Sequence, residues 1–325
     1  MKLPDKIKMA LDETRMLILG AQILVGFQYT AVFREGFEDL PAHARYLDAA
    51  ALVLMIVAIG LLIEPSIQHR VVDHGEDTQR IQGVTTAMAC IALLPFATTL
   101  GLDLYIVGEK MAGMTAGAVA GVAGIGLALI FWYGVELAHR KERPAMEGNR
   151  NEKPAPTPIG KKIEQMLTEA RVILPGAQAL FGFQLTVILT ASFDRLPLFA
   201  KAVHAASIGC IALAVILLMA PAAYHRIVYG GEDDPGFYRI GGRFVLAATV
   251  PLALGLSGDL YVVIEKIAGS RVVGAIVAAV ALAGLIGFWH VYPAWLRHGR
   301  QRQDAGDMRG PDVGRMRTVG SSGSR

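Results

Sequence analysis

Four polar residues recur as a group at two places in the chain, 156 positions apart. The first group reads Asp103-Leu-Tyr105-x-Val-x-Glu109-Lys110, and its polar members return as Asp259, Tyr261, Glu265 and Lys266. Each group ends an apolar run that would be about 28 Å long as a helix. Carboxylates at such a boundary, where tyrosine is also common, fix the depth of a helix in a membrane. The alternative is an outer vestibule, shared by Asp103 and Asp259, that attracts a solute or cation.

Four glutamines lie inside two of the apolar runs, at Gln22, Gln28, Gln178 and Gln184. Gln22, Gly26 and Thr30 are spaced by four residues, which places them on one face of a helix. Amide side chains in an apolar helix form hydrogen bonds to neighbouring helices, each worth about 1 kcal/mol. The sequence therefore predicts close helix packing at this face, with a polar path or solute site as the alternative.

Charged residues flank the same runs at their other ends. Glu13-x-Arg15 precedes the first run and His69-Arg70 follows the second, and the pattern returns as Glu169, Arg171, His225 and Arg226. Consecutive helices are usually neighbours, and the two flanks lie at matching depths. We therefore predict that Glu13 pairs with Arg70 or His69. By the same reasoning Glu169 pairs with Arg226 or His225, as a structural ion pair or as a gate or lipid-headgroup site.

The sequence contains no pattern that indicates catalysis. It has no nucleophile elbow, no glycine-rich phosphate loop before a lysine, no HExxH motif and no paired carboxylates inside an apolar run. His69 and Asp73 share a helical face, but the second copy has Tyr229 in place of Asp73, whereas a duplicated metal site would keep its ligands. The formal charge of +3 and the lack of a basic face indicate no nucleic-acid role. We expect no enzymatic activity, no cofactor and no metal.

Eight long apolar runs position these residues. Apolar residues make up 53% of the chain and charged residues only 18%, whereas soluble proteins carry about 25% charged residues. A bilayer core about 30 Å thick needs about 20 helical residues, and core helices of soluble proteins would show a polar face. The runs cover residues 16–33, 47–63, 81–102, 111–135, 172–191, 202–223, 244–264 and 272–296. The sequence thus predicts an all-α polytopic membrane protein with eight transmembrane helices, whose main partner is the lipid bilayer.

The eight runs form one four-helix unit that is written twice. Gly20–Thr30 and Gly176–Thr186 share eight of eleven residues, and so do Asp103–Gly113 and Asp259–Gly269. Four helices return the chain to its starting side, so the two units have the same orientation and are parallel repeats. A single unit could have formed a twofold dimer, which the fusion makes covalent.

The polar segments complete the domain organisation. Residues 1–15 form an entry segment, 16–140 the first unit, 141–162 a charged and proline-rich linker, 163–298 the second unit and 299–325 a disordered tail rich in glycine and arginine. Ile7 and Leu11, like Ile163 and Met166, are spaced as on one helix face, which predicts short amphipathic helices in the interface.

Basic residues are distributed unevenly between the two sides. Lys and Arg number 24 on the side of the termini and 7 on the opposite side. Because basic loops remain in the cytoplasm, we predict cytoplasmic termini.

Several short motifs resemble a family of uncharacterised bacterial four-helix membrane proteins, a domain of unknown function. The resemblance rests on Glu13-x-Arg15, Gly20-x-Gln22, Phe27 and Pro65-x-x-x-His69-Arg70, and covers about residues 10–140 and 166–298. It implies a bacterial plasma-membrane location and four helices per unit. It supplies no activity, substrate or cofactor, and the tandem duplication departs from the single unit of the family.

Two classes of function fit these features. The favoured hypothesis is a non-enzymatic membrane protein with a structural, regulatory or partner-binding role, which includes a membrane-protein partner or a homo-oligomer. The alternative is a small-solute or ion permease or channel with its path between the two repeats. No Asp, Glu, Lys or Arg lies near the middle of a run, which disfavours an ion-coupled carrier.

Overall fold

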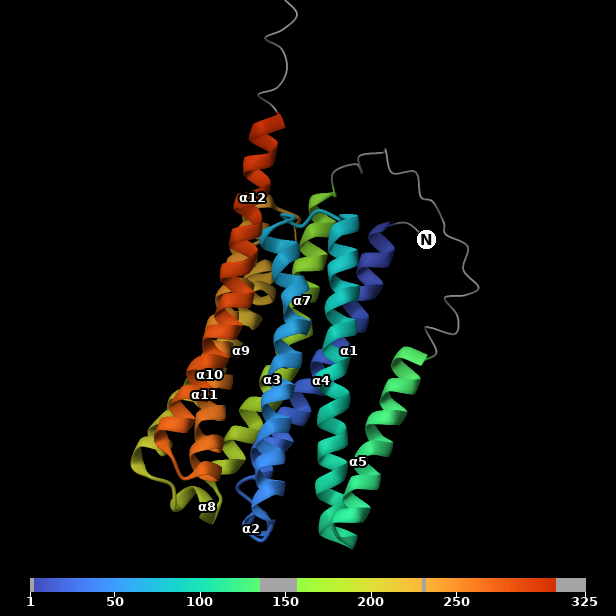
Figure 1. The fold of residues 1–325 in the computed structure, drawn as a ribbon. Helices are drawn as coiled ribbons and strands as arrows, with labels where there is room; N and C mark the ends of the chain where they lie inside the picture. The colour runs from blue at the N-terminus through green and yellow to red at the C-terminus, as the bar shows by residue number, and fades with distance from the viewer. Residues whose placement is uncertain (1–2, 135–156, 230–231, 308–325) are drawn as a thin grey trace, which may run out of the picture.

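The computed structural model describes residues 3–134, 157–229 and 232–307, whose secondary structure is entirely helical. The first half forms α1 (Leu3–Ala31), α2 (Glu35–Glu38), α3 (Ala42–Val71), α4 (Gln79–Ala112), α5 (Met114–Leu129) and the π-helical turn η1 (Ile130–Gly134). The second half forms α7 (Ile159–Ile188), α8 (Ala191–Asp194), α9 (Leu198–Ile227), α10 (Pro235–Ala268), α11 (Arg271–Ile286), the π-helical turn η2 (Gly287–Val291) and α12 (Tyr292–Asp307). The long helices run side by side, with α2 and α8 at one end and the N-terminus at the other (Figure 1).

Capping side chains and glycines fix the helix boundaries in both halves. Thr78 accepts a backbone N–H at the start of α4, and Asp234 accepts two at the start of α10. Gly113 and Gly269 join α4 to α5 and α10 to α11 with φ angles of 89° and 63°. Backbone with positive φ favours glycine, so a glycine ends the helix at equivalent positions, although one residue links α4 to α5 and two link α10 to α11.

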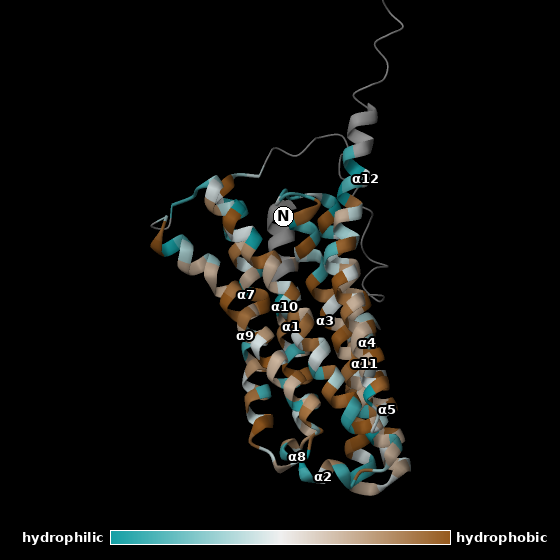
Figure 2. Ribbon diagram, turned by 90° about the vertical axis from the view of Figure 1, so that its left-hand side faces the viewer, coloured by the Kyte–Doolittle hydropathy of each residue, from teal (hydrophilic) through white to brown (hydrophobic). Residues whose placement is uncertain are grey.

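Seven helices among the described residues are long and apolar enough to cross a membrane: α3, α4, α5 with η1, α7, α9, α10, and α11 with its continuation into α12. Hydrophobic residues follow these helices along their length, and hydrophilic residues gather at the two ends of the bundle (Figure 2). The eighth predicted span lies in α1, which is not among the seven although its 29 residues extend about 43 Å. Gln22 and Gln28 lower its hydropathy, and both side chains are buried.

The helices α1 and α7 pack against each other and join the two halves. The rings of Phe27 and Phe183, which are equivalent residues, have centroids 4.8 Å apart. Gly26 leaves room for the Phe183 ring, which would lie 2.0 Å from a Cβ at that position. Each of the two helices is flanked by helices of its own half, α1 by α3 and α4, and α7 by α9 and α10.

A second contact between the halves is made by only one of two equivalent sets of helices. The helix α3 packs against α10 and η2, whereas α9 makes no contact of comparable extent with α4 or η1. Trp289 of η2 is fully buried and its indole N–H donates to the Gly60 carbonyl of α3 at 2.9 Å. Its counterpart Trp132 instead packs edge-on against Phe96 of its own half, with centroids 5.7 Å apart.

The amphipathic entry helices predicted from the sequence are not separate elements. The helix α7 is continuous from Ile159, and Ile163 and Met166 are buried inside the protein. Met166 packs onto Gly241 of α10, so the apolar face that was assigned to an interface is covered by protein. The side chains of Ile7 and Leu11 lie outside the described residues.

The polar segments differ in part from the prediction. Most of the linker at 141–162 lies outside the described residues, and its end forms the start of α7. The helix α12 continues to Asp307, so the tail predicted to be disordered is helical over residues 299–307. The rest of the tail also lies outside the described residues.

Candidate functional site

Two equivalent pairs of glutamine and aspartate lie between helices of the same half. The Gln28 side chain on α1 donates to both carboxylate oxygens of Asp103 on α4, each at 3.2 Å. The Gln184 side chain on α7 donates to one oxygen of Asp259 on α10 at 2.7 Å. Asp259 is 2% exposed, and no described ion pair gives either aspartate a cation. The glutamines predicted to form interhelical hydrogen bonds thus hold the carboxylates predicted to lie at the boundary.

The two pairs have different neighbours. Tyr29 of α1 lies within 2.5 Å of Nδ1 of His204 on α9, and the other ring nitrogen of His204 lies 3.1 Å from the Gln184 carbonyl. Tyr29 and His204 are fully buried. Their polar contact therefore joins the two halves, out of reach of solvent, beside Asp259. The position equivalent to His204 is Asp48, which is buried on α3. No sequence motif marks Tyr29, His204 or Asp48, although the 156-residue repeat places Asp48 and His204 at one equivalent position.

Gln22 and Gln178 differ although they are equivalent. Gln22 is 1% exposed, and neither polar atom of its side chain has a described partner. Its amide fills the space above Gly176 of α7. Gln178 is exposed. The predicted hydrogen bond from this face is therefore absent for Gln22 in the described residues, because the side chain meets a glycine rather than a polar group.

The ion pairs predicted near the termini form between the halves and not within them. Glu169 of α7 pairs with Arg70 of α3 and lies 2.9 Å from Nδ1 of His69. Glu169 and His69 are each 2% exposed. The predicted pairing within each half was wrong, because α7 carries its glutamate towards α3 of the other half.

The remaining members of these motifs do not join that cluster. Glu13, Arg15, Arg171 and Arg226 are exposed. The His225 ring instead stacks on Phe237, with centroids 4.4 Å apart. One glutamate of the repeated motif, Glu169, therefore lies in the cluster between the halves.

A further buried carboxyl lies near this cluster. Glu64 of α3 is fully buried and accepts a hydrogen bond from Gln68 at 2.9 Å. Glu64 was not predicted as a buried residue because the apolar run ends at residue 63, whereas α3 continues to Val71. Ionisable side chains therefore lie deeper within the helices than the runs indicated.

The loop between α3 and α4 is held by Arg80 of its own half and by Arg300 and Lys162 of the second half. Arg80 and Arg300 both pair with Asp73, the latter at 3.0 Å. Glu76 pairs with Lys162 at 2.5 Å. Partial burial acts to raise the pKa of Glu76, but Lys162 and nearby hydrogen bonds outweigh it and hold that pKa below its usual value.

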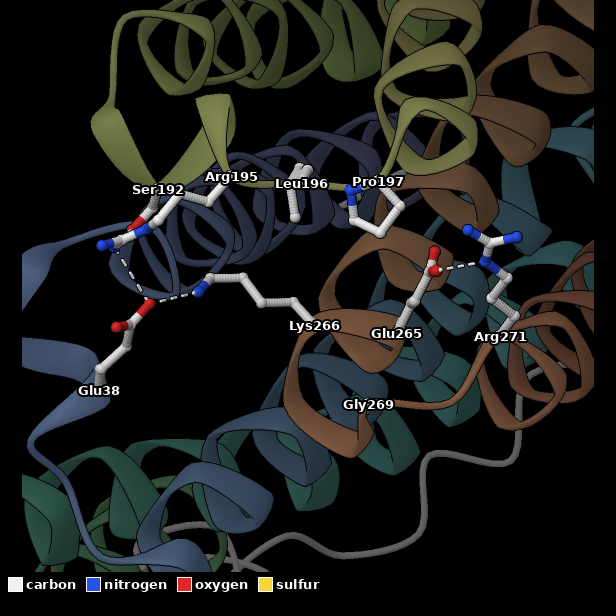
Figure 3. A pocket seen from close by; sticks show the side chains of 9 residues that line it. All are labelled: Glu38, Ser192, Arg195, Leu196, Pro197, Glu265, Lys266, Gly269 and Arg271. Carbon is white, nitrogen blue, oxygen red and sulfur yellow. Dashed lines mark hydrogen bonds and ion pairs between the residues drawn. The ribbon is translucent and has the colours of Figure 1, made fainter.

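A cleft of about 520 Å³ opens at the opposite end, between α8, α10 and the chain near α2 (Figure 3). Glu38 accepts from Lys266 at 3.1 Å and from Arg195 at 3.3 Å, and Glu265 accepts from Arg271 at 3.2 Å. The hydrogen bond and charge of Lys266, with the charge of Arg195, lower the pKa of Glu38. Three cations thus face two carboxylates around this cleft.

The first half arranges the equivalent motif differently. Glu109 lies 2.8 Å from Nε2 of His43, and Tyr105 packs edge-on against the same ring. Lys110 is exposed. Tyr261, the counterpart of Tyr105, packs against Phe199, which stands where the first half has His43.

The described clefts do not bring Asp103 and Asp259 into a shared vestibule, because neither aspartate lines any of them. The described residues also contain no group of three or more His, Cys, Asp or Glu side chains that could hold a metal ion. The carboxyls of Asp103, Asp259 and Glu64 thus accept hydrogen bonds from neutral glutamine side chains.

A comparison with known families identifies the chain's relatives. The model described as "Family of unknown function (DUF6328)" matches residues 5–136 and again 157–293. The chain therefore belongs to this family, as the resemblance in its motifs predicted, and the family's domain matches it twice in tandem, in agreement with the internal repeat. No curated protein and no solved structure matches the chain.

Proposed function

We propose that this member of the family spans a bacterial plasma membrane with eight helices, as two parallel four-helix units with cytoplasmic termini. The seven long apolar helices support this placement. The helix α1 is long enough to be the eighth, and its two glutamines face the protein interior rather than lipid. The basic residues concentrated on the side of the termini support the orientation.

We propose further that the protein conducts protons across the membrane between its two units, without enzymatic activity. One observation carries this function: Asp103 and Asp259 are held by neutral amides and by no described cation. A carboxylate at membrane depth without a counter-charge is strongly disfavoured. Such a group is stable when it holds a proton and unstable when it has lost one, which suits transient proton binding.

Polar residues between the units suggest a route. Asp259, Tyr29 and His204 lie towards the outer end, and Glu169 with His69 lies towards the termini. Gln22 contacts α7 at Gly176, which is about 12 Å from the level of Gln184 and about 10 Å from Glu169 along the helix. Its unpaired amide is therefore midway between the two ionisable groups, and a chain of several water molecules would be needed to connect it to both.

The test is proton flux in liposomes that contain the full chain and a pH-sensitive dye. A potassium gradient with valinomycin supplies the driving force. We expect the parent protein to exceed empty vesicles, Asp259→Asn to lower the flux strongly and Asp103→Asn to lower it less. Asp194→Asn, at an exposed position on α8, is the matched control. Parent vesicles that match empty vesicles, or an unaffected Asp259→Asn variant, would show that the proposal is wrong.

A structural or regulatory role is the second candidate. It is favoured by the ion pairs between the units, at Glu169 with Arg70 and at Glu38 with Lys266. It is also favoured by the fact that neither Asp103 nor Asp259 lines a described cleft. Under this role the aspartates fix helix packing, and a membrane-protein partner or second copy supplies the function. A folded, stable chain without proton or small-solute flux, whose double Asn variant at 103 and 259 misfolds, would favour it.

A further inference from the structure

An apolar groove runs along the junction of the two units. It has a volume of about 560 Å³. Its walls are residues 53–61 of α3, Leu260 of α10, and residues 276–288 of α11 and η2, and every residue that lines it is apolar or glycine. No polar group is present to hold water, so the groove suits a hydrocarbon.

The groove is continuous with the contact that joins the units. Gly60 forms part of its wall, and a Cβ at that position would lie 3.1 Å from a methyl group of Leu285. Behind this wall the indole of Trp289 donates to the Gly60 carbonyl. Whatever fills the groove therefore contacts both units at the place where they are bonded to each other.

The depth of the groove matches membrane hydrocarbon. Residues 276–288 rise about 18 Å along the helix, somewhat more than half of a core about 30 Å thick. The groove begins five residues beyond the start of α11 at Arg271, which places it inside the apolar part of the helix. This step rests on the membrane placement proposed above and not on the proton path.

A stack of aromatic rings leads out of the groove towards the termini. Phe288 lines the groove, its ring centroid is 5.8 Å from that of Tyr292, and the Tyr292 centroid is 6.4 Å from that of Trp295. Tyr292 is 38% exposed and Trp295 is 70% exposed. Rings of this amphipathic kind are enriched at the level of lipid headgroups.

We propose that this groove binds an acyl chain of a membrane phospholipid, with the headgroup beside Tyr292 and Trp295 on the side of the termini. The size of the groove favours a lipid chain over a second copy of the protein. A helix about 10–12 Å wide would reach this groove only with its side chains, whereas an extended acyl chain is thin enough to lie inside it. The bound chain bridges α3 and α11 and so stabilises the junction of the units.

The test uses a phosphatidylethanolamine with a photoreactive diazirine in its acyl chain, reconstituted with the full protein. Mapping of the labelled peptides is expected to show several-fold enrichment on residues 53–61 and 276–288 over the exposed face of α5. Gly284→Phe fills the groove, because nothing lies within 4 Å of the Gly284 Cβ position, and should remove the enrichment. Gly209→Phe on α9, which is equally open, should not.

Each outcome decides the proposal. Uniform labelling of all exposed faces, labelling unchanged by Gly284→Phe, or no lipid labelling at residues 53–61 and 276–288 would overturn it. Val280→Phe, at a lining residue that is 68% exposed, repeats the test if Gly284→Phe folds poorly. Lipid labelling is measured independently of proton flux. Labelling of the groove in a protein that conducts no protons would support lipid binding and refute proton conduction.

Discussion

Asp103 and Asp259 occupy equivalent positions and accept the same hydrogen bond from an equivalent glutamine. Their neighbours differ, because Asp259 lies beside a tyrosine from the first half and a histidine from the second. Asp103 lies near a second carboxyl, Asp48, from its own half. The hydrogen-bonded pair of glutamine and aspartate is therefore the same in both units, whereas the side chains beside the aspartate differ.

A similar difference between equivalent residues is found at two other contacts between the halves. Glu169 is buried against Arg70, while its counterpart Glu13 is exposed. Trp289 reaches across to α3, while Trp132 stays within its own half. Identical residues thus become interface residues in one copy only, so each equivalent pair supplies a mutation with its own control.

The largest expected difference is between Glu169→Ala and Glu13→Ala. Removal of Glu169 leaves Arg70 and a buried His69 without their carboxylate, and breaking a buried pair costs about 3–5 kcal/mol. The exposed Glu13 should change stability by less than about 0.5 kcal/mol. Thermal unfolding of the purified chain in detergent measures both, and equal shifts for the two variants would refute the asymmetry.

The next difference is between Gly26→Ala and Gly182→Ala. A methyl group at Gly26 would meet the Phe183 ring at 2.0 Å, whereas nothing lies within 4 Å of the same group at Gly182. Overpacking costs about 1–3 kcal/mol, while alanine at an open helical position is tolerated or gains about 0.5–1 kcal/mol. The unfolding midpoint should therefore fall for Gly26→Ala and stay the same or rise for Gly182→Ala. A loss of stability in Gly182→Ala as large as that in Gly26→Ala would mean that α7 is covered at this position.

A smaller difference is expected between Trp289→Phe and Trp132→Phe. The first loses the hydrogen bond from the indole to the Gly60 carbonyl, worth about 1 kcal/mol. The second keeps its aromatic contact with Phe96 and loses no bond between the halves. Limited proteolysis of the chain, which reports loosening of the junction, should accelerate for Trp289→Phe alone. Equal acceleration of proteolysis in both variants would mean that the smaller side chain causes the effect, and not the loss of the hydrogen bond to Gly60.

Helix types and approximate positions followed from the sequence because apolar periodicity and length depend on local residues. The internal repeat was equally legible, but it did not predict that Gln28 would bind Asp103. What could not be read was which copy of a repeated residue would lie between the halves. Glu13 and Glu169 have the same local sequence, Glu-x-Arg, and only the packing of α7 towards α3 distinguishes them.

Helix ends were also less predictable than helix centres. Glu64 follows the last apolar residue of its run, yet backbone hydrogen bonding carries α3 on to Val71 and buries the carboxyl. Tyr29 and His204 were missed because a single tyrosine or histidine in an apolar run has no signature of its own. Their pairing depends on contact between distant segments, which no local pattern records.

The smallest expected effect contrasts Lys266, which binds Glu38, with its exposed counterpart Lys110. The hydrogen bond from Lys266 and its charge lower the pKa of Glu38 below the ordinary value of 4.5 in the folded protein. A lowered pKa in the folded state stabilises the protein above pH 4.5, and this contribution is lost as the pH falls through the folded-state pKa. Because Glu38 is largely exposed, the pair contributes less than about 1 kcal/mol. We expect Lys266→Ala to lower the unfolding midpoint slightly at pH 7 and to match the parent at a pH below the pKa of Glu38, while Lys110→Ala matches the parent throughout. A Lys266→Ala difference that persists at low pH would assign the effect to the packing of the lysine stem and not to the ion pair.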